Sequence, residues 1–205
     1  MKSLAIMGMP RGGTTVTMDL FRDVPGIIIM DEVPFPDMRQ AINRGHVVVW
    51  KSPHDCLKGA SLAQKLPKVQ QIYVVKDGRA NLASHKTYLE KYGTDPSWAP
   101  YQGPKGFASL WNKFAERALK AETRFRLEDL ISEAGQGIIG HLFTLCEYPG
   151  EDATIDFWCG HIARRSSANY PRKAVTLGTP PWREVLSARE ASWIDRGLLG
   201  ALGYE

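Results

Sequence analysis

Short apolar segments alternate with amphipathic segments along the first half of the chain. Runs rich in isoleucine and valine predict buried strands at Ser3–Met7, Ile27–Met30, His46–Trp50 and Gln71–Val75. Segments of helical character lie between and after these runs, at Thr14–Arg22, Pro36–Asn43, Asp55–Lys65 and Arg79–Glu90. Alternation of strand and helix is typical of an α/β fold with a parallel sheet and right-handed crossovers.

The second half of the chain is predicted to be mainly helical. Apolar residues of Phe107–Leu119 fall on one helical face, and two further amphipathic segments lie at Ile138–Cys146 and Ala188–Leu199. A fifth strand is predicted at Thr123–Leu127. We therefore expect a three-layer α/β/α architecture around a central parallel sheet of four to five strands, in a single domain that spans residues 1–205.

Composition limits the classes to which this chain can belong. Hydrophobic residues make up 43% and charged residues 23%, which excludes disordered and collagen-like chains. The three cysteines show no CxxC spacing, so neither a disulfide framework nor a zinc site is expected, and the thiols indicate a cytoplasmic location. No apolar run approaches the roughly 18 residues of a membrane span. The net charge of +4 is too small to indicate a nucleic-acid partner, but it suits an anionic ligand if the excess is local.

Glycines and threonines follow the first predicted strand, in the sequence GMPRGGTT at residues 8–15. Glycines let the backbone turn tightly, so that its N–H groups converge on an anion at the start of the next helix. Arg11 adds a positive charge, and Thr14 and Thr15 add hydroxyl donors. The nucleotide-binding pattern GxxxxGK[ST] is matched except at its lysine, where Thr14 stands. The segment therefore predicts a phosphate-binding loop that lacks the lysine for a nucleotide's terminal phosphates.

The pattern PRGGTT after a strand resembles the 5′-phosphosulfate loop of the sulfotransferases that use 3′-phosphoadenosine 5′-phosphosulfate (PAPS). The usual form of that loop is PxSGTT, with Lys or Arg at x. The resemblance implies that the cofactor is bound by Arg11, Gly12, Gly13, Thr14 and Thr15. Gly12 stands in place of the usual serine, which removes one hydroxyl donor but leaves the backbone amides.

A second segment, KDGRANLAS at residues 76–84, resembles the family's 3′-phosphate motif. That motif is an apolar strand followed by RDPR-like residues, with a serine eight positions after the first arginine. Lys76 stands at the position of that arginine and Ser84 at the position of the serine. A cation at a strand end and a hydroxyl on the next helix can contact one phosphate from two sides. Because lysine makes a point contact where arginine makes a fork, Arg79 is expected to supply the fork.

Two later segments extend the resemblance to the end of the chain. FRLEDL at residues 125–130 resembles the family's RYEDL segment, a strand that leads into a helix. WREVLS at residues 182–187, followed by LGY at residues 202–204, resembles its WRxxL…LGY region. The resemblance implies a fold like that of the P-loop NTPases, with PAPS as the donor and 3′-phosphoadenosine 5′-phosphate (PAP) as the product.

Sulfuryl transfer to a hydroxyl needs a base for the acceptor's proton and cations for the leaving phosphate. Asp31 and Glu32 follow the second strand, at the sheet edge where ligands of α/β folds collect. The resemblance implies that Glu32 is the base. Either carboxylate could instead be a charge at a helix N-terminus, and Asp31 fits that role better. Lys51 matches a lysine that lies near the transferred group, so Lys51 and Arg11 are expected to stabilise the developing charge. His54 is the alternative base, one position later than the family's KTH pattern requires.

Four cations and no acid lie within Ala163–Thr176. The resemblance implies that Arg164 and Arg165 cover the cofactor's 3′-phosphate, and a solvated loop is the alternative. A nucleic-acid-binding patch is the rival functional interpretation, but no recognised nucleic-acid motif accompanies the cluster.

The sequence thus predicts a sulfotransferase that moves a sulfuryl group from PAPS to an acceptor hydroxyl without a metal. A P-loop kinase or NTPase, and a non-catalytic anion- or nucleic-acid-binding module, remain as alternatives. The acceptor is expected to contact variable loops at Pro34–Arg39, Gly93–Lys105 and Ser166–Trp182. The last two are long and rich in proline, glycine and polar residues. Because a short chain leaves little room for a deep pocket, a saccharide or another large acceptor is favoured. The sequence does not specify an oligomeric state.

Overall fold

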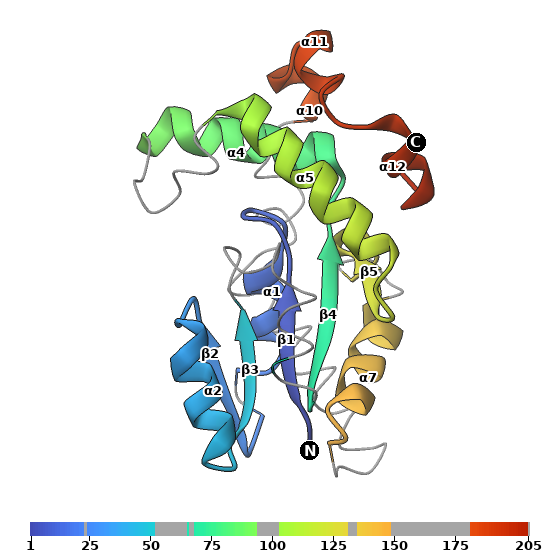
Figure 1. The fold of residues 1–205 in the computed structure, drawn as a ribbon. Helices are drawn as coiled ribbons and strands as arrows, with labels where there is room; N and C mark the ends of the chain where they lie inside the picture. The colour runs from blue at the N-terminus through green and yellow to red at the C-terminus, as the bar shows by residue number, and fades with distance from the viewer. Residues whose placement is uncertain are drawn as a thin grey trace.

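Five parallel strands form the centre of the molecule (Figure 1). The computed structural model describes residues 1–22, 24–51, 65, 68–93, 103–130, 135–148 and 181–204. The strands are β1 (Ser3–Met7), β2 (Ile27–Asp31), β3 (Val47–Lys51), β4 (Val69–Val75) and β5 (Arg124–Arg126). Their order in the sheet is β2-β3-β1-β4-β5. The predicted parallel sheet is confirmed, with all five strands at the predicted places.

Helices lie between strands of the sheet and make up most of the described residues after β4. They are α1 (Thr14–Asp19), α2 (Phe35–Asn43), α4 (Gly78–Tyr92), α5 (Pro104–Leu119), α6 (Leu127–Leu130), α7 (Gly135–Leu145), α10 (Trp182–Val185), α11 (Ala188–Ala191) and α12 (Arg196–Ala201). The helix predicted at Asp55–Lys65 lies outside the described residues except for Lys65, as do most of the two predicted long loops. No helix in the described ranges is long and apolar enough to cross a bilayer.

Side chains on the two faces of the sheet belong to two separate buried clusters. Met7 and Trp50 lie in the cluster that includes residues of α2 and α5. Ile6 and Val49 lie in the cluster that includes residues of α1 and α7. Because alternate residues of a strand point to opposite faces, a fully apolar strand needs helices on both sides. The three-layer α/β/α architecture predicted from the sequence is confirmed.

The single helix predicted over Ala188–Leu199 is wrong, because the chain turns between α11 and α12. The Asp195 carboxylate accepts a hydrogen bond from the Leu198 N–H at 2.9 Å and so starts a new helix. Asn112 of α5 fixes the turn, since its side chain donates to the Trp193 carbonyl at 3.0 Å and accepts from the Asp195 N–H at 3.1 Å. The turn buries Ile194, which is 1% exposed, so the apolar periodicity here reports tertiary packing rather than one helix.

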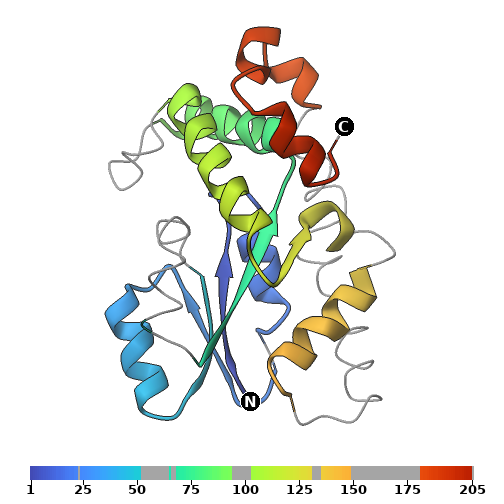
Figure 2. The ribbon, with the colours of Figure 1, turned by 45° about the vertical axis from the view of Figure 1, so that its right-hand side comes forward.

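The central strands β3, β1 and β4 end side by side beneath α4 and α5 (Figure 2). In register, Ile6 of β1 lies beside Lys51 of β3, and Met7 lies beside Tyr73 of β4. The three segments that follow these strands therefore start at one edge of the sheet. Ligands of open α/β sheets bind at the carboxyl ends of the strands, at the point where the order of successive strands across the sheet reverses.

Candidate active site

The loop between β1 and α1 is tightly turned. The Gly12 N–H donates to the Met9 carbonyl at 2.9 Å, and Arg11 and Gly13 have φ angles of 62° and 92°. A Cβ on Gly13 would lie 2.5 Å from Leu127 Cδ1, so only glycine fits this left-handed position. A Cβ on Gly8 would likewise clash with the Thr14 methyl group. The glycines thus let the loop backbone pack closely, as the phosphate-loop prediction requires.

Gly12 stands where the resembled loop has serine, and restoring that serine should destabilise this protein. A Cβ at residue 12 would lie 2.7 Å from the Met9 carbonyl oxygen, a backbone atom that cannot rotate away. We expect Gly12→Ser to lower the free energy of unfolding by about 1–3 kcal/mol in chemical denaturation. Gly137→Ser is the matched control, because nothing lies within 4 Å of a Cβ there. Equal stability of the two variants would contradict this account of the loop.

Asn81 connects α4 to the phosphate loop. Its side-chain amide donates to the Pro10 carbonyl at 2.9 Å, and the residue is only 1% exposed. The amide oxygen has no partner among the described residues. The contact holds the loop against the helix that carries Ser84, which is itself buried. No sequence pattern indicated this role, because the two partners are 71 residues apart.

The Lys51 ammonium joins the phosphate loop to the carboxylates at the end of β2. It donates to Thr15 Oγ1 at 2.7 Å and lies 2.9 Å from Asp31 Oδ1 and 3.2 Å from Glu32 Oε1. The Lys51 side chain is 5% exposed, whereas each carboxylate is 45% exposed. The cation is therefore fixed by three partners, while both carboxylates remain accessible to a ligand. The alternative role of Asp31, a charge at a helix N-terminus, did not anticipate its ion pair with Lys51.

Two predicted site residues have strained backbones. Arg11 and Glu32, with φ angles of 62° and 54°, are two of the three non-glycine residues with positive φ in the described part of the chain. The Glu32 conformation is held by its N–H, which donates to the Lys51 carbonyl at 3.0 Å. Such strain persists only where the surroundings impose it, and it gathers at binding and catalytic sites.

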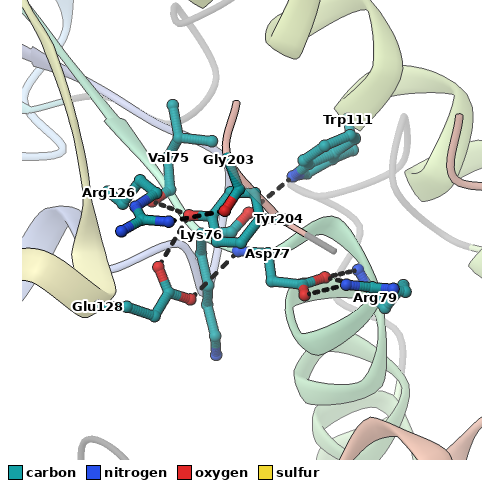
Figure 3. Close-up of polar contacts among 9 residues, drawn as sticks. All are labelled: Val75, Lys76, Asp77, Arg79, Trp111, Arg126, Glu128, Gly203 and Tyr204. Carbon is teal, nitrogen blue, oxygen red and sulfur yellow. Dashed lines mark hydrogen bonds and ion pairs between the residues drawn. The ribbon is translucent and has the colours of Figure 1, made fainter. Parts of the chain in front are cut away.

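Lys76 lies directly after β4, and its ammonium points away from the polar contacts around it (Figure 3). No described residue forms a hydrogen bond or ion pair with that ammonium. The pKa of Lys76 is lowered from its usual value, chiefly because the side chain is buried. The Glu128 carboxylate opposes this shift, Arg11 adds to it, and Asp77 opposes it more weakly than Glu128. A largely buried cation without a described partner is available to an anion from outside the chain.

The Arg79 guanidinium, predicted to form a fork on a phosphate, already forms one with Asp77. The distances are 3.0 Å from Nε to Oδ1 and 2.7 Å from Nη2 to Oδ2. The Asp77 carboxylate also caps α4 by accepting from the Arg79 N–H at 2.8 Å. The guanidinium carbon of Arg79 also lies over the Trp182 ring, 4.8 Å from the ring centroid. Arg79 therefore ties the start of α4 to α10.

The remaining predicted residues divide between the described and the undescribed parts of the chain. Arg11 is exposed beside the phosphate loop, with its guanidinium carbon 5.2 Å from the Tyr88 ring centroid. Thr14 is buried at the start of α1. The residues that lie outside the described ranges are His54, Arg164 and Arg165. Within the described ranges, no cluster of three or more His, Cys, Asp or Glu side chains could hold a metal ion.

Two solved structures with a fold similar to this one are sulfotransferases. The mouse sulfotransferase SULT7A1, crystallised with PAP, aligns with 98% of this chain and 85% of its own, at a TM-score of 0.63 and 11% identity. The sulfotransferase domain from the curacin biosynthetic pathway aligns with 100% of this chain and 98% of its own, at a TM-score of 0.60 and 12% identity. No family model and no curated protein sequence matches the chain. The chain therefore has the fold of the PAPS-dependent sulfotransferases, as its motifs predict.

Proposed function

We propose that this protein is a sulfotransferase that binds PAPS at the carboxyl ends of β3, β1 and β4 and transfers its sulfuryl group to an acceptor hydroxyl. One observation carries the proposal: three adjacent strands bring the phosphate loop, Lys51 and Lys76 to one edge of the sheet. The solved structure of SULT7A1 contains PAP, which supports the same ligand class here.

The described residues fit a doubly phosphorylated nucleotide. The loop at residues 8–15 offers a glycine cradle that a Cβ would fill, and Lys51 fixes Thr15 at its far end. Lys76 offers a buried ammonium without a described partner, with Ser84 on the helix that follows. We assign the loop to the 5′-phosphosulfate and Lys76 with Ser84 to the 3′-phosphate. Arg164 and Arg165 remain predicted covers of the 3′-phosphate.

The bound donor would supply the sulfuryl group and a phosphate leaving group. Glu32 accepts the proton of the acceptor hydroxyl, because its carboxylate is accessible and lies beside the cation that faces the loop. Lys51 and Arg11 neutralise negative charge that develops during the transfer. His54 is the alternative base. We propose a hydroxyl on a saccharide or another large molecule as the acceptor, and a transfer that needs no metal.

Replacing Lys76 with methionine should weaken PAP binding without destabilising the free protein. Removing the cation that pairs with a buried phosphate lowers the binding free energy by about 2 kcal/mol or more, so the dissociation constant should increase roughly 30-fold. Burial already disfavours the charged lysine, so an apolar side chain of similar length should leave the melting temperature unchanged or higher. Calorimetric titration with PAP and thermal unfolding measure the two effects.

Lys68→Met is the matched control, because Lys68 is exposed before β4 and should change neither quantity. Absence of PAP binding by the unaltered protein would overturn the proposed function. Tighter binding of ATP with magnesium than of PAP would favour the kinase alternative. PAP binding without turnover on a panel of hydroxyl acceptors would favour a non-catalytic binding module.

A further inference from the structure

The two peptide groups that flank Lys76 are held by side chains from distant parts of the chain (Figure 3). On one side, the Tyr204 hydroxyl donates to the Val75 carbonyl at 3.0 Å. On the other, the Asp77 N–H donates to Glu128 Oε1 at 3.2 Å. The Tyr204 hydroxyl also lies 2.8 Å from Glu128 Oε2, so its single proton is shared and the two supports are connected.

Further contacts fix the same peptide groups and their supports. The Trp111 indole N–H donates to the Lys76 carbonyl at 3.2 Å. Arg126 donates to the Gly203 carbonyl at 2.7 Å, and its guanidinium carbon lies 5.6 Å from the Tyr204 ring centroid. The Lys76 backbone is thus held from α5, from α6 and from the C-terminal end of the chain. This degree of support exceeds what a solvated cation at a strand end needs.

The side chains of this cluster have complementary charge states. Burial, together with the Glu128 carboxylate, raises the pKa of Tyr204 well above its usual value, so the phenol is a neutral donor. Glu128 is the largest influence that raises the pKa of Lys76, against the effects of burial and of Arg11. Asp77 acts in the same direction as Glu128 but more weakly, and its carboxylate is paired with Arg79. Glu128 therefore both holds the Lys76 backbone and favours the charged form of its side chain.

We propose that Glu128 and Tyr204 are positioning residues that present the Lys76 ammonium, charged and in a fixed orientation, to the anion that binds after β4. The inference rests on the proposed function only for the identity of that anion, the 3′-phosphate of PAP. Neither residue forms a hydrogen bond with the ammonium. Tyr204 acts through the backbone, and Glu128 acts through the backbone and through its charge.

The electrostatic part is tested on the free protein by NMR titration of the lysine side chains, with the Lys76 signal assigned by its absence in Lys76→Met. Glu128→Gln keeps the shape of the side chain and removes its charge, so it should lower the pKa of Lys76. Asp129→Asn is the matched control. It also removes a carboxylate from this helix, but that carboxylate pairs with Arg126. An unchanged Lys76 pKa in Glu128→Gln, or an equal decrease in the control, would overturn this part.

The binding part is tested by PAP calorimetry across a pH series. Because only the charged lysine attracts phosphate, affinity should fall as pH rises through the pKa of Lys76, and it should fall at a lower pH in Glu128→Gln. Tyr204→Phe removes one hydroxyl and keeps the ring, so it should weaken PAP binding about two- to tenfold at neutral pH.

These measurements separate the inference from the proposed function. If the unaltered protein does not bind PAP, the proposed function fails, and the NMR titration still decides whether Glu128 controls Lys76. If Glu128→Gln does not fold, Tyr204→Phe decides alone. The proposal would be overturned by an unchanged PAP affinity in Tyr204→Phe. It would also be overturned if PAP affinity fell at the same pH in the unaltered protein and in folded Glu128→Gln.

Discussion

Replacing Glu32 with glutamine should lower the turnover number for sulfuryl transfer by about 10²- to 10⁴-fold, the range for a positioned general base. The amide cannot accept the acceptor's proton, although it fills the same space. PAP affinity should change little, because the side chain is assigned to the acceptor's proton rather than to a phosphate.

Asp31→Asn provides a closely matched comparison. Both carboxylates contact the Lys51 ammonium, at 2.9 Å for Asp31 and 3.2 Å for Glu32, and both are 45% exposed. They differ in backbone, since Glu32 is held at a φ of 54° after the strand has ended. We expect Asp31→Asn to retain most of the turnover. If Glu32→Gln retains it instead, the base assignment is wrong, and His54→Ala becomes the decisive variant.

Local sequence signals were sufficient for the sheet and for the tight turn between β1 and α1. Four short apolar runs predicted β1 to β4, since a strand covered on both faces favours uninterrupted apolar residues. The fifth strand, β5, lies within the separately predicted segment Thr123–Leu127. A glycine-rich turn between a strand and a helix is also a local pattern, and Gly13 occupies the left-handed position that such a turn requires. Lys51 and Lys76 were singled out because the segments that contain them resemble sulfotransferase motifs at the ends of strands.

Contacts between distant segments were beyond the reach of sequence patterns. The Tyr204–Glu128 contact joins residues 76 positions apart. In the sequence, Glu128 belongs to the segment FRLEDL and Tyr204 to the segment LGY, and neither segment indicates the other as its partner. In the sequence, nothing distinguishes Asn81 from other polar residues of a helix, whereas in the structure its side chain donates to the Pro10 carbonyl. The break between α11 and α12 has the same origin, because Asn112 of α5 stabilises a turn that local periodicity does not show.

Replacing Lys51 with methionine should lower the turnover number by about 10²- to 10³-fold, as expected when a fixed donor to a developing negative charge is removed. In the described part of the chain, this ammonium connects the phosphate loop, through Thr15, to the pair Asp31 and Glu32. Without it, the two carboxylates repel each other and an incoming anionic donor. PAP affinity should therefore also decrease, which distinguishes this variant from Glu32→Gln.

Stability should change much less than activity in Lys51→Met. Methionine fills the space of a side chain that is 5% exposed, and the carboxylates left behind are accessible to water. The double variant Lys51→Met/Asp31→Asn removes half of the uncompensated negative charge, so it should recover part of the PAP affinity but not the turnover. A double-mutant cycle of calorimetric affinities measures that recovery. Lys51 is the assigned residue that contacts both Thr15 of the phosphate loop and the proposed base Glu32. If Lys51→Met has the same turnover number as the unaltered protein, Lys51 has no part in the mechanism.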